Sequence, residues 1–393
     1  MKASRHFSSR VARRSRAPLK SIESPLCIKV MAPMEEQLKF RTPALAKKVA
    51  DRIKSLAPSY KVKFCHVCGT HEWAITHHGL RALLPKTVEV IAGPGCPVCI
   101  LPAADIDEAI SLALKGVTVA TYGDVIRVPA SKTSLQEAKA SGGDVRIVYG
   151  VGDAVKMAKK EPNRDFVFLA IGFETTAPST AVEVLNKPPE NLSFLVSHRL
   201  IPPAMELLLG VEGLQINGFI APGHVSTIIG VKAYEMFPKV YHMPTVVAGF
   251  EPLDILFAIS MLLKQTKDGE ARLENEYPRS VKWNGNVKAQ QLIEKVFKVV
   301  GGQWRGLETI PSSALVLREE FAVYDARKKY DIKIEGSRDL LPGCLCHLVI
   351  VGKINPPECP LFMKACTPQT PNGACMVSNE GTCRIWAKHK ITD

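Results

Sequence analysis

Eight short runs of β-forming residues recur along the chain, and each is followed by a turn signal and a stretch with helical character. The runs lie at 62–64, 88–91, 117–120, 145–148, 166–169, 194–196, 218–220 and 245–247. Strands that alternate with helices form βαβ units, in which neighbouring strands of a sheet run parallel. The sequence therefore predicts an α/β fold with two Rossmann-like, parallel-sheet domains.

A chain of 393 residues can hold several domains, and its pattern changes along its length. We expect a basic, disordered arm over residues 1–36, an α/β domain over 37–150 and a second α/β domain over 151–255. Residues 256–393 should form a helical, cysteine-rich iron–sulfur domain. Two helices are predicted near its start, at 255–263 and 288–300.

The N-terminal arm accounts for much of the positive charge. Its first 30 residues hold eight basic residues against the single acid Glu23 and so carry +7 of the net charge of +13. The remainder is only mildly basic, which does not favour nucleic-acid binding. The arm is similar to a transit peptide in composition, but we interpret it as a disordered arm or as residues preceding a start at Met31 or Met34. No apolar run is long enough to cross a bilayer, so no membrane association is expected.

The 11 cysteines are strongly clustered. Four lie near the start of the first α/β domain, six lie near the C-terminus, and only Cys27 is solitary. Disulfide frameworks belong to small secreted domains, whereas the arm lacks the apolar core of a secretory signal. Clustered cysteines in a large cytoplasmic protein indicate metal binding or redox chemistry.

The first chemical motif is Cys68-Gly69-Thr70-His71-Glu72, directly after the strand predicted at 62–64. Residues at the carboxyl end of a parallel strand face the crevice where α/β proteins bind ligands. We expect Thr70, His71 and Glu72 to open a helix. A helix N-terminus and a protonated His71 would both lower the pKa of the Cys68 thiol.

The second motif, Gly-Pro-Gly-Cys-Pro-Val-Cys at 93–99, holds the same position after the next strand. A Cys-x-x-Cys pair at a strand end is a redox or metal-binding motif, and the glycines allow a tight loop and close backbone approach. The two motifs should bring Cys68, Cys96 and Cys99 together at one crevice, with His71 and Glu72 nearby. Three soft thiolates suit iron, zinc or copper(I).

A structural zinc site is an alternative for these cysteines. Cys65 and Cys68 form one Cys-x-x-Cys pair and Cys96 and Cys99 form another, as in four-cysteine zinc sites. However, Cys65 belongs to the predicted strand, and no glycine supplies the bend of a zinc knuckle between Cys65 and Cys68.

Polar residues also follow three strands of the second series. Glu174, His224 and Glu251 lie at turns after the strands at 166–169, 218–220 and 245–247. We expect these three side chains to converge at strand ends, although none is individually specific. Nearby Thr175, Thr176 and Ser226 are better explained as helix caps.

Six cysteines within 40 residues form the C-terminal cluster: Cys344, Cys346, Cys359, Cys366, Cys375 and Cys383. Packing alone does not require so many. Four could hold an iron–sulfur cluster while two form a redox pair, and a zinc domain is the alternative.

Taken together, these motifs resemble the signature of the HypD family of hydrogenase maturation factors. The similar segments are Cys-Gly-Thr-His-Glu at 68–72, Gly-Pro-Gly-Cys-Pro-Val-Cys at 93–99, Gly-Phe-Glu-Thr-Thr at 172–176, Pro-Gly-His-Val-Ser at 222–226 and the cysteine-rich tail at 359–383. The resemblance extends over residues 37–388. Trp73 departs from the pattern, since histidine is expected there in many relatives, but it affects no proposed ligand.

The resemblance implies a cytoplasmic scaffold that acts with HypC and HypE to assemble the Fe(CN)2CO unit of nickel–iron hydrogenases. It implies iron at the crevice thiols, a 4Fe–4S cluster, and a redox pair whose Cα atoms lie within about 7 Å, the limit for a disulfide. Glu380 is a candidate proton donor to that pair, or else a surface carboxylate. The implied cluster ligands are Cys344, Cys359, Cys366 and Cys383, and the implied pair is Cys346 and Cys375.

A different class of function is a stand-alone oxidoreductase, in which Cys96 and Cys99 act as a dithiol supplied with electrons by the iron–sulfur cluster. Such an enzyme would tolerate the loss of Cys68, whereas an iron scaffold would not. We favour the scaffold, expected to be monomeric before it joins its partners, over a conventional enzyme.

Overall fold

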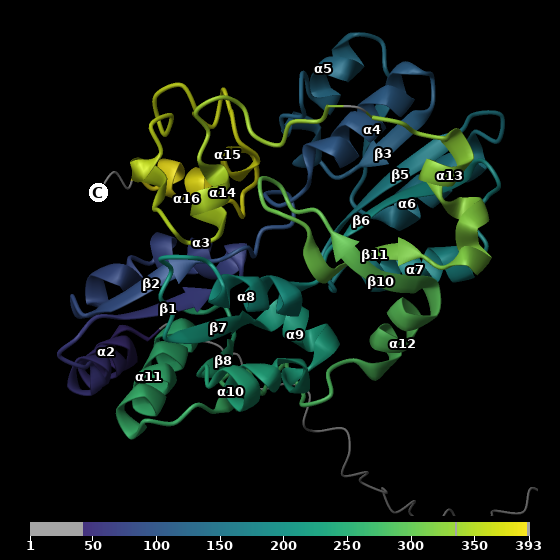
Figure 1. Ribbon diagram of the computed structural model, residues 1–393. Coiled ribbons are helices and arrows are strands. Elements are labelled where there is room, and N and C mark those ends of the chain that lie inside the picture. The colour runs from purple at the N-terminus through teal and green to yellow at the C-terminus, as the bar shows by residue number, and fades with distance from the viewer. Residues whose placement is uncertain (1–41, 335, 391–393) are drawn as a thin grey trace, which may run out of the picture. The chain divides into compact units, whose positions relative to one another are not determined.

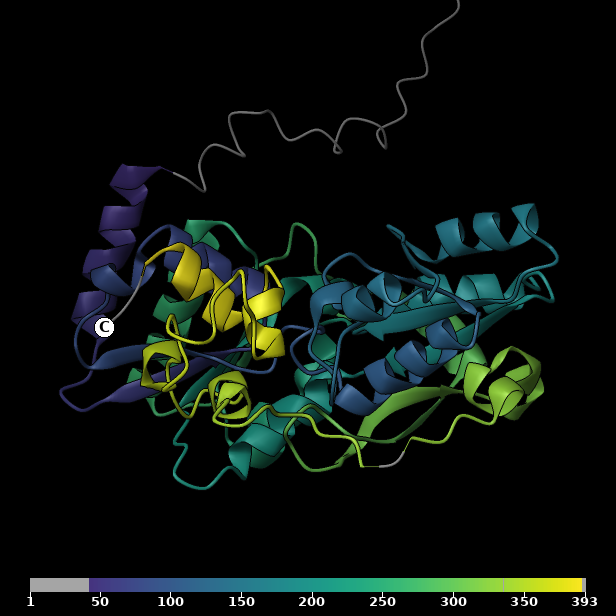
Figure 2. The same cartoon turned by 90° about the horizontal axis from the view of Figure 1, so that it is seen from above.

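The computed structural model describes residues 42–390 apart from residue 335, so the arm predicted at 1–36 lies outside the described part. The described residues form a five-stranded and a four-stranded sheet, both parallel, and a two-stranded antiparallel sheet (Figures 1 and 2). None of the helices between residues 42 and 390 is both long and apolar enough to span a membrane.

The five-stranded sheet carries the first two cysteine motifs. Its strands, in spatial order, are β2 (Val88–Ala92), β1 (Val62–His66), β7 (Gly218–Pro222), β8 (Thr245–Ala248) and β9 (Leu273–Asn275). Since β1 and β2 are parallel neighbours, with His66 opposite Ala92, the loops that follow them emerge at the same edge of the sheet.

The four-stranded sheet has the order β4 (Val145–Ile147), β3 (Thr118–Thr121), β5 (Phe166–Gly172) and β6 (Leu192–His198). Every residue of β5 and β6 is buried. Continuous burial of this kind is typical of parallel strands covered by helices on both faces. All eight predicted strands are therefore confirmed, and the α/β class with parallel sheets is correct.

The predicted domain boundaries do not follow the sheets. Strands β3 and β4 were assigned to the domain 37–150, but β4 pairs with β3 and β3 pairs with β5 of the predicted second domain. Strand β7, assigned to 151–255, pairs with β1. The range 256–393 is also divided, because β9 extends the five-stranded sheet. Local patterns identify strands, but the pairing partner of each strand depends on packing between distant segments, so the linear division was wrong.

Helices surround both sheets. Those of the α/β region are α2 (Pro43–Leu56), α3 (Gly69–His77), α4 (Ala103–Leu114), α5 (Leu135–Ala140), α6 (Val151–Lys160), α7 (Ala177–Leu185), α8 (Ile201–Leu209), α9 (Gly223–Ile229), α10 (Met236–Tyr241) and α11 (Pro252–Asp268). The helix predicted at 255–263 is α11. It begins earlier because Pro252 occupies its first turn and Glu251 and Asp254 form a capping box, and it ends at the left-handed Gly269.

Three apolar clusters hold these layers together. One packs α2 and α11 on a face of the five-stranded sheet, and a second packs α6, α7 and α12 (Val287–Val296) on a face of the four-stranded sheet. The third is continuous from residues of both sheets to the C-terminal cysteines. The cysteine-rich tail is therefore part of the main core.

The amphipathic helix predicted at 288–300 is only partly correct. Helix α12 ends at Val296, and the chain continues as β10 (Phe297–Gly302), which pairs antiparallel with β11 (Ile310–Leu317). β-Branched Val299 and Val300 fit this strand, and the pairing with β11 outweighs the helical pattern of the preceding turns. The short helix α13 (Ala326–Tyr330) follows β11.

Short helices also organise the C-terminal segment, where the sequence shows no periodicity. They are α14 (Cys346–Ile350), α15 (Ala374–Val377) and α16 (Thr382–Lys388). Both views show this segment beside α3, the helix that follows Cys68 (Figures 1 and 2).

Gly230 provides a test of the packing around the five-stranded sheet. It has φ +79°, and an added Cβ would lie 2.4 Å from the Trp283 carbonyl oxygen. Replacing Gly230 with Ala should lower the free energy of unfolding by about 2–4 kcal/mol, through backbone strain and overpacking. Urea denaturation measures this change. Gly213→Ala is the matched control, because Gly213 has φ +74° but no atom near the added Cβ. An equal loss of unfolding free energy in the two variants would show that the contact with Trp283 contributes nothing.

Candidate functional site

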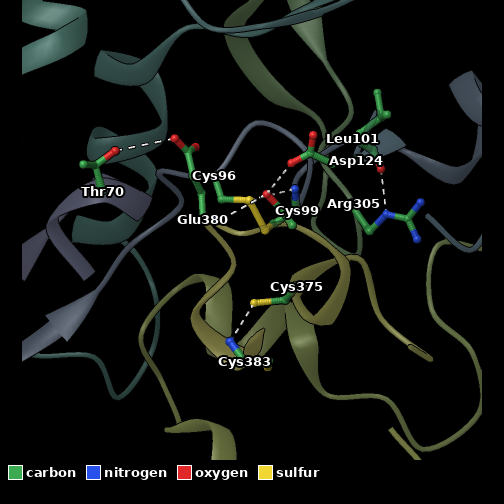
Figure 3. The surroundings of a disulfide bond; sticks show 10 residues. Thr70, Cys96, Cys99, Leu101, Asp124, Arg305, Cys375, Glu380 and Cys383 are labelled. Atoms are coloured by element: carbon green, nitrogen blue, oxygen red, sulfur yellow. Dashed lines mark hydrogen bonds between the residues drawn. A yellow bond between two sulfur atoms is a disulfide. The ribbon is translucent and has the colours of Figure 1, made fainter. Parts of the chain in front are cut away.

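Cys68, Cys96 and Cys99 lie around one pocket at the edge of the five-stranded sheet. We call it the thiol pocket. Figure 3 shows the Cys96–Cys99 disulfide of this pocket with Glu380 nearby. The C-terminal segment completes its wall with Cys375 and Glu380. The structure thus brings together the three cysteines that the motifs selected, and it adds residues that lie about 280 positions further along the chain.

The close approach of two loops forms this pocket. Cys68 precedes the first residue of α3, and Cys96 lies in the loop after β2. The Gly69 amide donates to the Gly95 carbonyl at 3.2 Å, and a Cβ on Gly95 would lie 2.2 Å from the Cys68 nitrogen. Gly95 is therefore required for the contact between the two motifs.

Cys96 and Cys99 form a disulfide, with Cα atoms 5.3 Å apart. The Cys99 amide donates to the Cys96 carbonyl at 3.1 Å, which closes a tight turn. Cys68 remains a free thiol. The pocket therefore combines a disulfide pair, which can exchange two electrons, with two free thiols, Cys68 and Cys375.

The pKa of Cys68 is shifted in the direction opposite to our expectation. Burial, followed by the nearby Glu380 carboxylate, raises the pKa of the thiol to about 11, although the amides of His71 and Thr70 partly oppose the shift. His71 does not help, because burial lowers its pKa to about 3 and keeps its ring neutral. Loss of hydration raises the pKa of Cys68 by more than the amides at the helix N-terminus lower it.

His71 and Glu72 do not line the thiol pocket. The His71 ring is fully buried, and its Nε2 donates to the Gly249 carbonyl oxygen at 2.9 Å. This bond fastens α3 to the loop after β8. The His71 ring therefore positions α3, and toward Cys68 only the backbone amide of His71 is directed.

Glu72 is the centre of a buried hydrogen-bond network. Its carboxylate accepts from Arg81 at 2.7 and 3.0 Å, from Thr76 at 2.6 Å, from His66 at 2.9 Å and from the Trp386 indole at 2.7 Å. Burial alone would raise the pKa of Glu72, but the Arg81 charge and the His66 hydrogen bond outweigh it, and the pKa lies well below its usual range. Glu72 thereby connects α3 to α16.

Glu380 reaches the thiol pocket from the turn before α16. The Thr70 hydroxyl donates to its carboxylate at 3.5 Å, and Gly69 allows the approach, since an added Cβ would lie 2.4 Å from the Glu380 carbonyl oxygen. Burial, followed by the Asp124 charge, raises the pKa of Glu380. Glu380 is therefore neither a surface carboxylate nor part of the wall around Cys346; it faces the pocket that holds Cys68.

The alternative zinc site is not assembled. Cys65 is buried within β1 and is absent from the wall of the thiol pocket. Among residues 42–390, no three histidine, cysteine or acidic side chains are arranged to hold a single metal ion.

The polar turns of the second series do not form one site. Glu174 follows β5 of the four-stranded sheet, while His224 and Glu251 follow β7 and β8 of the other sheet. His224 stacks on Phe250 with ring centroids 3.8 Å apart. None of the three residues lines the thiol pocket.

The six C-terminal cysteines surround a second cavity, which we call the cysteine cavity. All six side chains are buried and free of disulfides. They come from α14, α15, α16, the loops between these helices and the turn before α14. The amides of Asn372 and Cys383 donate to Cys366 and Cys375, each at 3.3 Å. Six soft donors around one space, with backbone N–H groups directed at sulfur, match the ligand chemistry of an iron–sulfur cluster better than that of one ion.

The thiols of the cysteine cavity interact in two pairs. A hydrogen bond from Cys346 lowers the pKa of Cys344 to about 7. Cys383 forms a hydrogen bond with Cys375, which together with burial raises the pKa of Cys383. The redox pair implied for Cys346 and Cys375 is not formed as a disulfide in this structure, although both line the same cavity. That pairing stays a prediction.

Cys375 belongs to both sites. It lines the thiol pocket with the Cys96–Cys99 disulfide, and it also lines the cysteine cavity (Figure 3). One thiol therefore separates the two sulfur-rich spaces.

Sequence reasoning missed the partners of Glu72. His66, Arg81 and Trp386 are individually unremarkable in sequence, and only their contact with one buried carboxylate gives them a role. His66 is the last residue of β1 and lies two residues after the strand predicted at 62–64, which was the one available signal.

The fold and site define a class: an interleaved α/β protein in which a strand-end thiol and a Cys-x-x-Cys pair adjoin a cysteine-lined cavity. A family model named HypD, described as the hydrogenase formation hypA family, matches residues 44–390. The chain belongs to the HypD family.

Curated relatives agree with this assignment. A Methanocaldococcus jannaschii protein, provisionally named for hydrogenase expression/formation, is 49% identical over 351 residues, covering 88% of this chain and 98% of the relative. The hydrogenase maturation factors HypD of Rhizobium leguminosarum bv. viciae and Cupriavidus necator are each 44% identical, covering 88% of this chain and 94% of each relative. A general role in hydrogenase formation follows.

Replacement of Glu72 by Gln tests the network between α3 and α16. The free energy of unfolding should fall by about 3–5 kcal/mol, because the variant leaves a buried charge pair broken. The same stabilisation should be lost in the wild type as pH falls below the ordinary glutamate pKa of 4.5, since the folded pKa of Glu72 is lowered. Guanidinium denaturation measures both effects. Glu89→Gln, which alters an exposed carboxylate, should cost under about 1 kcal/mol; a similar small loss for Glu72→Gln would contradict the argument.

Glu174 should make stability fall as pH rises. Burial raises its pKa from 4.5 to about 7, although the Ile201 amide opposes the shift, and its second carboxylate oxygen has no hydrogen-bond partner. The folded state therefore binds more protons than the unfolded state between these values, and up to about 3 kcal/mol is lost across the window. Urea unfolding at pH 5 and pH 8 should show a smaller difference in Glu174→Gln than in the wild type. The exposed-site control Glu190→Gln should behave like the wild type; an unchanged difference in Glu174→Gln would refute the assignment.

Proposed function

We propose that this chain is a cytoplasmic scaffold for assembly of the Fe(CN)2CO unit of nickel–iron hydrogenases, with thiol and iron–sulfur redox chemistry. The observation that carries the proposal is the position of Cys375, which borders both the thiol pocket and the cysteine cavity. A site for iron and a source of electrons would then share one wall. The family membership and the names of the relatives support the hydrogenase context.

The thiol pocket is the proposed binding site for the iron that is being processed. Cys68 would be the first ligand because, of the two free thiols in the pocket, it is the one supplied by the strand-end motifs. Cys96 and Cys99 would either join it after reduction or transfer electrons. Thiolates are soft donors suited to iron, and binding the cation replaces the thiol proton, which offsets the unfavourable burial of the charge.

The cysteine cavity would hold a 4Fe–4S cluster through Cys344, Cys359, Cys366 and Cys383. The fit rests on its six buried thiols and on the amides that donate to sulfur. A bound cluster supplies one-electron transfer. Cys346 and Cys375 would form the adjacent redox pair. Glu380 would hold a proton beside Cys68 and Cys375, since these three residues line the same pocket.

HypC and HypE are the proposed partners. Cyanide and iron must reach Cys68 from outside the chain, so the partners should dock where the thiol pocket opens. The partners would contact the loops at 93–99 and 378–382, which form part of the pocket wall. Crosslinks formed only at the distant β4 edge of the four-stranded sheet would contradict this placement.

The stand-alone oxidoreductase remains the second candidate, because the Cys96–Cys99 disulfide adjoins Cys375. The two functions differ in their need for Cys68. A dithiol enzyme requires only the disulfide and its electron source, whereas an iron scaffold requires the free thiol.

Variants of the thiol pocket separate these functions. Cys68→Ala and Cys96→Ala should each abolish hydrogenase maturation in cells and remove the cyanide and carbonyl infrared bands of the protein purified anaerobically with HypC. Both variants should remain folded, because each removes one sulfur from a pocket wall. Cys65→Ala is the matched control, because Cys65 is a buried free thiol of β1 that does not line the pocket. Maturation that persists in Cys68→Ala would favour the oxidoreductase.

A further inference from the structure

Arg305 is a buried arginine next to the chain that leaves the Cys-x-x-Cys loop. Only 2% of the Arg305 surface is exposed. Arg305 follows the buried Trp304 in the loop after β10. The guanidinium extends toward the segment that leaves the Cys-x-x-Cys loop (Figure 3). A buried arginine normally needs an ion pair to offset the loss of hydration. Among the described residues, no carboxylate lies within ion-pair distance of Arg305, although the Asp339 and Asp107 carboxylates act on its charge from further away.

Hydrogen bonds fix the position of this side chain. Nε donates to the Leu101 carbonyl at 2.6 Å and Nη1 donates to the Asp339 carbonyl at 2.8 Å, while the backbone amide donates to Ile100 at 3.0 Å. The remaining nitrogen, Nη2, is buried and has no hydrogen-bond partner in the described chain. Two hydrogen bonds therefore hold the guanidinium in place, while both N–H groups of Nη2 have no partner in the described chain.

Asp339 completes a clamp on the same segment. Its carboxylate accepts from the Ala103 amide at 2.7 Å and from the Gly306 amide at 2.9 Å. Arg305 and Asp339 together hold residues 100–103, which directly follow Cys99. The clamp links the Cys-x-x-Cys loop to the start of the C-terminal segment.

The cysteine cavity lies next to this clamp. An added Cβ on Gly306 would lie 2.8 Å from the Cβ of His347, so the chain after Arg305 packs on the turn that begins with Cys346. The Arg305 charge acts on Cys346 and Cys344, together with the carboxylates of Asp339 and Asp107. Two thiols of the cysteine cavity therefore lie within electrostatic range of the Arg305 guanidinium.

We propose that Arg305 is a positioning residue that sets the reduction potential of the redox centre in the cysteine cavity, through its fixed charge and its unused Nη2–H groups. This inference rests on the proposed function, because it assumes that the cavity holds a 4Fe–4S cluster. A one-electron reduction adds one negative charge to the sulfur-lined site, and a low-potential reductant supplies the electron. A guanidinium remains protonated in proteins, and its attraction to added charge is strong where water is excluded.

Substitution of Arg305 tests the proposal. Arg305→Gln removes the charge and should lower the equilibrium constant for reduction of the cluster by about tenfold, which is about 59 mV for a one-electron couple. Arg305→Lys retains the charge and should change the constant by less than about threefold. The full-length chain, purified anaerobically, is titrated with dithionite while the reduced cluster is followed by electron paramagnetic resonance. Iron and sulfide content per chain is measured in parallel.

Arg127→Gln is the matched control. Arg127 also links the α/β region to the C-terminal segment, by donating to the Pro368 and Gln369 carbonyls at 3.0 and 3.2 Å, but its charge is not among those that act on Cys344 and Cys346. The Arg127→Gln variant should keep the wild-type reduction potential. A shift equal to that of Arg305→Gln would overturn the proposal, because it would show that loss of any arginine between the α/β region and the C-terminal segment changes the potential.

The remaining outcomes are distinct. A wild-type chain without iron and sulfide would refute the proposed function and the inference together. An intact cluster with an unchanged potential in Arg305→Gln would overturn the inference alone. If Arg305→Gln does not fold or load, the lysine variant decides: a potential near that of the wild type supports the role of charge, and a tenfold change in the equilibrium constant overturns it.

Discussion

The site depends on one buried carboxylate. Glu72 accepts five hydrogen bonds from side chains of β1, α3, the following turn and α16. Ionised and fully buried, it is stabilised only while Arg81 and the other donors remain in place. Because Trp386 is one of these donors, the C-terminal segment is fixed against the helix that begins beside Cys68. This link helps to keep Cys375 and Glu380 facing the first two motifs.

Burial, more than charge, controls the chemistry of the thiol pocket. Burial raises the pKa of Cys68 to about 11 and lowers that of His71 to about 3, so both groups are neutral at neutral pH. The helix N-terminus does not reverse this, since its amides offset only part of the lost hydration. Such a thiol is a poor nucleophile by itself but a suitable ligand once a cation replaces its proton.

Much of the fold could be predicted from local pattern. The eight runs of β-forming residues all became strands, and the helix at 255–263 was found because its apolar content is high throughout. The errors arose where long-range pairing decided the outcome. Phe297–Gly302 continued a helical pattern but pairs with β11, and β3 follows β2 in sequence but lies in the other sheet.

By itself, the sequence determined the α/β class, the strand-end positions of Cys68 and Cys96, and the grouping of six cysteines near the C-terminus, because all three depend on spacing along the chain. Only the tertiary structure decided that Glu72 and His71 hold α3 in place and that Glu380 faces Cys68. It also decided that Cys375 lies between two sulfur-rich spaces and that Arg305 is buried beside them. These roles come from contacts between segments that are far apart in the sequence. The pattern of residues around a buried polar group does not identify its distant hydrogen-bond partner.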